Sequence, residues 1–167
     1  VISLAAIAQV DMATSSETVI KTMNQFNLEA EKSNSVVDIM ASSFTNTALD
    51  MTKFSESMKF VGTSSRLAGL YVATTTALLV VMADNGLKAS IAGTSLNQML
   101  IQLAKPSSKV NKIFKKMGLE NETVTGKLTV LAASGIDVGE VFDLLDVRTG
   151  RAANVLLENI DVVDTLA

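Results

Sequence analysis

A short segment with two glycines, residues 82–96, constrains the fold of this chain more than any other feature. Its sequence, MADNGLKASIAGTSL, joins two helical patterns through a turn signal. Asn85 and Gly86 can take the positive φ angles that end a helix, because glycine has no Cβ to clash. Gly93 lies one turn into the next helix, where a missing side chain lets another backbone come close. The segment predicts a helix, a one-residue corner and a second, tightly packed helix.

The composition of the chain favours helices throughout. Apolar residues make up 48% of the 167 residues but aromatic residues only 4%, so the core must consist of Ala, Val, Leu, Ile and Met. Pro106 is the single proline, and periodic β-branched runs with hairpin signals are missing. We expect an all-α fold, a compact bundle of seven to nine short helices. It would form one domain, residues 1–167, with 1–104 and 105–167 as candidate sub-units.

Histidine and cysteine are both absent, which excludes several kinds of functional site. Disulfides and thiolate metal sites need cysteine, and histidine is the commonest general base and transition-metal ligand. Asp137, Glu140 and Asp143 recur along one predicted helix, but a metal site would need converging ligands from other elements. We interpret them as a solvated acidic face. We expect no catalytic residue, no metal and no cofactor.

Charge is unevenly distributed along the chain. The net charge is −3, yet residues 1–119 carry 11 basic and 8 acidic groups, and residues 120–167 carry 3 and 9. This asymmetry fits either head-to-tail contact with differently charged neighbours or two helices with solvated acidic faces. A lysine face on the predicted helix after Pro106 could contact phosphate; its residues are Lys109, Lys112, Lys115 and Lys116. Because the chain is acidic and lacks an aromatic stacking platform, DNA contact would be at most nonspecific.

Residues 67–83 carry no charge at all. Seventeen residues are at the short edge of a membrane span, and Gly69 and the threonines 74–76 lower the hydrophobicity further. Two interpretations stay open: a helix buried on most faces inside the bundle, or a segment that contacts a membrane or a partner. The residues predicted for such a contact are Leu70, Tyr71, Leu78, Leu79, Val80 and Val81.

Several residues are expected to mark helix ends. Asp11 is a predicted N-cap, and Pro106 should end a helix because the residue before proline is pushed out of the α region. Ser107 would then cap the next helix, and Gly118 would follow its last turn. The stretch 62–65, Gly-Thr-Ser-Ser, is expected to weaken its helix. The last helix is predicted from about residue 150 to 160.

Six short segments occur in the order in which a known family has them. Segment 82–96 resembles the LADAGIKGSQAGTALR element of that family, and FSESMKFVG (54–62) resembles its xEALKYVGP element. The other four are TMNQFNL (22–28), LAKPS (103–107), KMGL (116–119) and RTGRAA (148–153). Together they resemble the tail tape measure proteins of long-tailed bacteriophages, over about residues 11–159. The chain departs from that pattern at Thr63, where the family often has proline, and in residues 71–81, which lack the usual acidic groups.

The resemblance implies a structural protein of the virion that acts without catalysis. Family members lie in the lumen or tip of the tail tube, set tail length during assembly in the host cytoplasm, and assist genome ejection. Copies associate, commonly as trimers, and contact tail tube and tail tip or baseplate proteins. Two alternatives stay open: a membrane-inserting, pore-forming module that acts transiently on the host membrane during DNA delivery, and a carboxylate-based wall hydrolase. Because the sequence begins in mid-pattern without methionine, we expect a piece of a longer chain.

Overall fold

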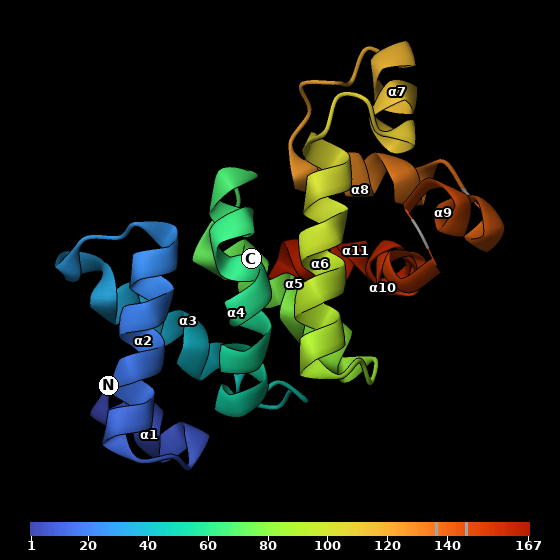
Figure 1. Cartoon of the computed structure of the whole chain (residues 1–167). Coiled ribbons are helices and arrows are strands. Elements are labelled where there is room, and N and C mark those ends of the chain that lie inside the picture. Colours follow the sequence, from blue (N-terminus) through green and yellow to red (C-terminus); the bar gives the residue numbers. More distant parts are fainter. Residues whose placement is uncertain (136, 146) are drawn as a thin grey trace.

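The computed structural model describes residues 1–135, 137–145 and 147–167, and every regular element in this part of the chain is helical (Figure 1). No strand occurs among these residues, so the all-α class is confirmed. In chain order the elements are α1 (Ile2–Ala8), α2 (Met12–Phe26), the 3-10 helix η1 (Ala30–Lys32), α3 (Ser33–Ser43), α4 (Met51–Leu67), α5 (Val72–Asp84), α6 (Ala89–Ala104), α7 (Lys109–Lys116), α8 (Val124–Ala133), α9 (Val138–Leu145), α10 (Val147–Glu158) and α11 (Ile160–Leu166). The described residues thus form eleven α-helices, more than the seven to nine expected.

The number of helices differs partly because the end of the chain contains a break that the sequence did not predict. In place of one helix over 150–160, α10 ends before Asn159, and α11 begins directly after it. The Asn159 side chain donates from Nδ2 to the carbonyl oxygen of Val155 at 2.8 Å. Such local side-chain bonding competes with the helical pattern. Ile160 and Val163 of α11 are buried, so the chain after the break returns to the core.

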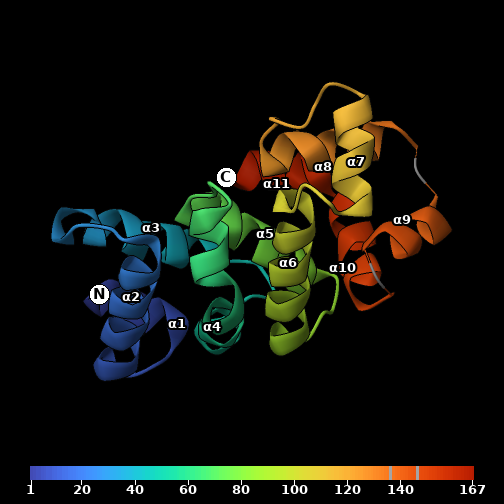
Figure 2. The same cartoon turned by 45° about the horizontal axis from the view of Figure 1, so that its top comes forward.

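Helix α5 is the centre of the fold. It contacts α3, α4, α6, α10 and α11, so helices from distant parts of the sequence enclose it (Figure 2). The hydroxyls of Thr75 and Thr76 donate to carbonyl oxygens one turn earlier, at 2.9 and 2.7 Å, so these buried threonines are satisfied within the helix. A helix that is apolar on every face is stable in water only when neighbours cover it. Enclosure therefore explains why α5 has no charge before its last residue, Asp84.

The remaining helices lie on two sides of this centre. Helices α1–α3 gather on one side of α4–α6, and α7–α9 gather on the other (Figures 1 and 2). Among the contacts between them, α2 packs on α4 and α7 packs on α6. The division of the chain into sub-units 1–104 and 105–167 stays a prediction.

Helices α4 and α6 lie side by side (Figure 1). Gly93 is the point at which α6 meets the backbone of α4. A Cβ atom on Gly93 would overlap the Ser57 carbonyl oxygen and would lie 2.9 Å from Ser57 Cα. At the same crossing, Ser57 Oγ donates to the carbonyl oxygen of Ala89 at 2.9 Å. Glycine is therefore required at position 93 by the approach of another backbone, as the sequence predicted.

The corner between α5 and α6 is longer than predicted. Four residues, Asn85–Lys88, separate the two helices instead of one. Of the Asn-Gly pair, only Gly86 has a positive φ, at 76°, while Asn85 takes a φ of −89°. The amides of Gly86 and Leu87 donate back to carbonyl oxygens of α5 at 2.9 and 3.0 Å. This Schellman motif needs a left-handed residue at one position only, and glycine occupies it.

Most predicted helix ends are found where the sequence placed them. Asp11 caps α2 by accepting the Thr14 amide at 2.9 Å, and α6 ends before Pro106. Gly118 follows α7 with a φ of 73°. The predicted cap at Ser107 is wrong by one residue, because the Ser108 side chain accepts the amide at the start of α7. The turn after Pro106 is one residue longer than predicted, so α7 begins one residue later.

The glycine in the middle of α4 does not weaken the helix as expected. Helix α4 continues through Gly62 to Leu67. Gly62 faces the side chain of Gln25 on α2, whose Nε2 donates to the carbonyl oxygen of Met58 at 2.9 Å. Gly62 thus has a packing role, and tertiary contact outweighs its low helix propensity.

Replacing Gly93 with alanine tests the crossing of α4 and α6. We expect Gly93→Ala to lower the free energy of unfolding by about 1–3 kcal/mol, the usual range for overpacking a core. The new Cβ would collide with the Ser57 backbone, which cannot move without shifting α4. Urea denaturation monitored by circular dichroism measures the change.

Gly126→Ala is the matched control for this experiment. Gly126 is also helical, but the nearest atoms that its Cβ would meet belong to the flexible side chain of Glu122. Alanine is favoured over glycine within a helix by about 1 kcal/mol, so this variant should be as stable as the original chain or more stable. Equal stability of the two variants would contradict the close approach at Gly93.

Candidate interaction surfaces

The six residues predicted to contact a membrane or a partner do not form one surface. Leu70 and Leu78–Val81 are at most 8% exposed, whereas Tyr71 is 79% exposed at the turn between α4 and α5. Gly69, with a φ of 81°, lies between α4 and α5, so residues 67–83 are not one helix. None of the described helices combines the length and the apolarity that a bilayer crossing requires. In this structure residues 72–83 of the charge-free stretch belong to the core helix α5, which begins directly after the exposed side chain of Tyr71.

The acidic residues of α9 are exposed, as the sequence predicted. Asp137 caps the helix, because its Oδ1 accepts the amides of Gly139 and Glu140 at 2.6 and 3.2 Å. Across the described part of the chain, no cluster of three His, Cys, Asp or Glu side chains is arranged to hold a metal ion. The acidic face of α9 is thus a surface feature with a capping role at its start.

Two other carboxylates have lowered pKa values, and both shifts come from helix-surface contacts. Hydrogen bonds from the Thr14 hydroxyl and amide lower the pKa of Asp11. The hydrogen bond and charge of Lys21, one turn along α2, lower the pKa of Glu17. Both carboxylates lie in open solvent, so these shifts indicate capping and pairing and do not indicate a catalytic acid or base.

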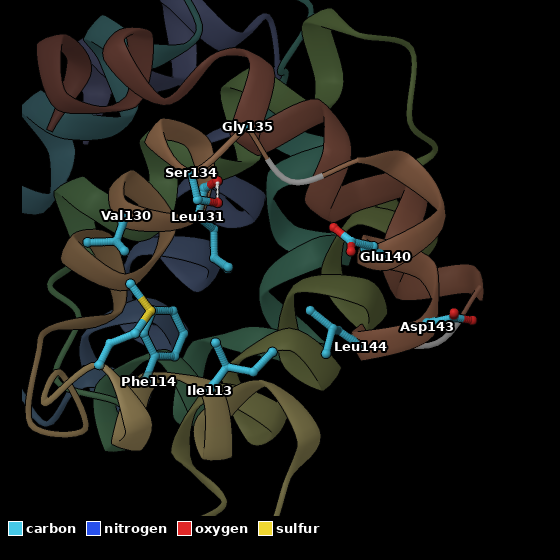
Figure 3. Close-up of a pocket in the computed structure, with 10 residues that line it drawn as sticks. Ile113, Phe114, Val130, Leu131, Ser134, Gly135, Glu140, Asp143 and Leu144 are labelled. Atoms are coloured by element: carbon cyan, nitrogen blue, oxygen red, sulfur yellow. Dashed lines mark hydrogen bonds between the residues drawn. The ribbon is translucent and has the colours of Figure 1, made fainter.

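Only half of the apolar face of helix α7 is buried inside the fold. Val110 and Phe114 are fully buried, but Ile113 is 37% exposed and Met117 is 52% exposed. These two exposed side chains line a hollow of about 430 Å³ between α7, α8 and α9. Figure 3 shows Ile113 of α7 beside Leu144 of α9, with α8 residues further along the wall. We call this hollow the α7–α9 groove; its apolar lining includes Ile113, Met117, Val130 and Leu144, and Glu140 and Asp143 lie on its α9 side.

The charged side chains that line the groove, Glu140 and Asp143, are both acidic. Glu140 and Asp143 are exposed on α9, while Lys112 and Lys116 are exposed on α7, close in sequence to Ile113 and Met117. Among the described residues, none of these four side chains forms an ion pair. Lys109 also belongs to α7, and its Nζ donates to the Asp143 carbonyl oxygen at 3.3 Å, which joins the two walls. Of the predicted lysine face, Lys109 thus contacts the α9 side of the groove.

Lys127 is a buried cation that sequence reasoning missed. Only 6% of the residue is exposed, and its Nζ lies 5.6 Å from the centroid of the Phe114 ring. The ammonium donates to the Glu120 carbonyl at 2.9 Å, and to the Leu103 carbonyl and Asn111 Oδ1 at 3.4 Å each. Within the described residues, it has no carboxylate partner. Its spacing from apolar residues of α8 was the available signal, because Val124, Leu128 and Leu131 share its face.

The contacts of Lys127 join four parts of the chain. Leu103 belongs to the last turn of α6, where carbonyl groups lack helical partners and the helix dipole favours a positive charge. Asn111 lies on α7, Glu120 lies in the connection after it, and Lys127 itself is on α8. One ammonium thus fixes the 105–123 segment against the rest of the fold.

Removing the ammonium tests this role. We expect Lys127→Met, which keeps an apolar stem, to lower the free energy of unfolding by about 1–3 kcal/mol, because buried acceptors lose their donor. Lys115→Met is the control, since Lys115 is exposed on α7 and a surface substitution changes stability by less than about 0.5 kcal/mol. Thermal unfolding measures both, and equal stabilities would rule out the role of Lys127.

Comparison with known proteins agrees with the family resemblance of the sequence. The sequence profile of the phage-related minor tail protein family matches residues 1–154. The tape measure protein of Pneumococcus phage Dp-1 is 33% identical over 131 residues, which make up 78% of this chain but only 11% of that relative. No solved structure matches the chain. The chain belongs to the phage-related minor tail protein family, and its relatives include a tail tape measure protein, as the sequence resemblance implies.

Proposed function

We propose that this chain is a non-enzymatic structural module of a tail tape measure protein. The extent of the family match carries the proposal, because it covers α1–α9 and most of α10. The aligned region is 11% of the length of the phage Dp-1 protein, so the module would be one part of a much longer chain. The parent chain would lie in the lumen or tip of the tail tube, set tail length and assist genome ejection. Its partners would be tube proteins, tip or baseplate proteins and further copies of itself.

The short helices indicate which part of this work the module performs. Its longest described helix, α4, has 17 residues, which span about 25 Å at roughly 1.5 Å per residue. A continuous helix of all 167 residues would span about 250 Å. Because the helices fold back around α5, the module adds little to the length of the parent chain. We infer that it holds neighbouring proteins, and that other parts of the parent chain measure the tail.

Internal deletions in the parent gene test the measuring role. Deletions outside this module, in segments that form continuous helix, should shorten the tail tube by about 1.5 Å per residue removed. Electron microscopy of assembled tails measures the length. Tails of unchanged length across a series of such deletions would contradict the role.

A substitution within the module tests the holding role separately. Gly93→Val in the parent gene should reduce the number of completed tails, because it disrupts the crossing of α4 and α6. The tails that do form should keep their normal length. Gly126→Ala is the control and should leave both number and length unchanged. Tails of normal number with Gly93→Val would contradict the need for a folded module.

A further inference from the structure

Asn85 and Gly86 form the one Asn-Gly pair in the sequence, and such a pair can deamidate without an enzyme. The backbone nitrogen of the glycine attacks Cγ of the asparagine side chain and forms a C–N bond. The bond from Cγ to Nδ2 breaks, and the amide proton leaves with Nδ2 as ammonia. Water then opens the resulting succinimide ring to aspartate or isoaspartate. Every other asparagine precedes a residue whose side chain hinders the attack, whereas glycine leaves its nitrogen accessible.

The pair is accessible to solvent at the corner between α5 and α6. Asn85 and Gly86 are both exposed. Apart from its chain neighbours, no described residue comes within 4 Å of the position that a Cβ on Gly86 would take. Water and hydroxide therefore reach both reacting groups, so the conformation of the corner must control the reaction.

Three features of the folded corner oppose closure of the succinimide ring. The attacking nitrogen of Gly86 donates its hydrogen to the Ala83 carbonyl oxygen at 2.9 Å. Asn85 Nδ2 donates to the Val81 carbonyl oxygen at 2.9 Å, which holds the side-chain amide against α5. The ψ angle of Asn85 is 16°, so the Gly86 nitrogen is nearly eclipsed with the Asn85 nitrogen. Ring closure needs it eclipsed with the Asn85 Cβ instead.

We propose that Asn85 is a deamidation site that the folded α5–α6 corner protects. In the folded chain the reaction proceeds only when the corner opens, so its rate is lowered by the small fraction of open molecules. In a chain that has not formed the corner, the pair reacts as it does in a free peptide. The extent of deamidation therefore measures the time that a chain has spent unfolded. The proposal does not depend on the role of the chain in a phage tail.

Deamidation changes the corner in ways that oppose refolding. The hydrogen bond from Nδ2 to the Val81 carbonyl is lost. The new carboxylate lies beside Asp84 at the C-terminal end of α5, where the helix dipole disfavours a negative charge. Isoaspartate also adds one carbon atom to the backbone between α5 and α6. That addition displaces α6, whose Gly93 must meet the Ser57 backbone.

Mass spectrometry of the tryptic peptide 67–88 tests the protection. The 167-residue chain is kept at mildly alkaline pH, in buffer and in guanidinium chloride. We expect conversion of Asn85 in buffer to be at least about tenfold slower than in guanidinium. A synthetic peptide of residues 80–92, incubated in both solvents, corrects for the effect of guanidinium on the chemistry. Equal corrected rates would overturn the proposal, and so would faster deamidation of another asparagine in guanidinium.

A variant that loosens the corner tests whether this part of the fold gives the protection. Asp84 Oδ1 accepts the Ala48 amide at 2.6 Å and so ties the end of α5 to the connection before α4. Asp84→Ala should raise the ratio of the rate in buffer to the rate in guanidinium about threefold, the effect of losing an ordinary hydrogen bond. Asp38→Ala, at an exposed position on α3, is the control and should leave the ratio unchanged. An unchanged ratio in Asp84→Ala would overturn protection by the corner.

Refolding tests the consequence of the reaction. Chains deamidated in guanidinium and diluted into buffer should unfold at a lower temperature than chains diluted at once, as circular dichroism measures. Asn85→Gln is the control, because glutamine would have to form a larger ring and deamidates more slowly. Its unfolding temperature should be the same before and after the long incubation. Recovery of the original unfolding temperature by deamidated chains would overturn the effect on refolding.

Discussion

The structure depends on one constraint: α5 must be covered on every side. Its residues 72–83 carry no charge, and its buried hydroxyls bond within the helix, so α5 has no polar face to turn to water. Most helices in soluble proteins bury one stripe and expose the opposite face. Covering α5 needs helices on all sides, and α3, α4, α6, α10 and α11 supply them. The fold of many short helices follows from this requirement.

Close packing around α5 is achieved by small residues and local hydrogen bonds. Gly93 lets α6 lie directly against α4, and Gly62 gives room to the side chain of Gln25. The turns after α4, α5 and α7 each place a glycine with positive φ, which reverses the chain within a few residues. Near α7 and α8, hydrogen bonds from the buried Lys127 ammonium to backbone carbonyls hold neighbouring segments together. Close packing of helix backbones therefore stabilises a core that has few aromatic side chains.

Sequence reasoning succeeded where the cause of a feature is local. The cap at Asp11, the end of α6 before Pro106 and the left-handed Gly118 each depend on a few neighbouring residues. It failed where a distant contact decides the outcome. Gly62 was expected to weaken its helix, but Gln25 packs on it from α2. Lysine is rarely buried, so Lys127 on the apolar face of α8 gave only a weak signal.

The same division applies to the candidate surfaces. The lysines of α7 and the acidic residues of α9 are exposed, as their sequence pattern predicts, but that pattern does not predict that the two helices line one groove. That pairing depends on how α8 brings them together. Of the six residues predicted for an external contact, Tyr71 is exposed and the others lie in the core, because hydrophobicity alone cannot distinguish a lipid-facing helix from an enclosed one.

The cover that α11 provides has a consequence for how the chain is made. Helix α11 follows α5 by a long stretch of sequence, yet the two helices are in contact. The ribosome synthesises α5 well before α11. During that interval the apolar surface of α5 that α11 later covers is exposed to water. The emerging protein is most prone to aggregation in that interval, and a holding chaperone would have α5 as its natural target.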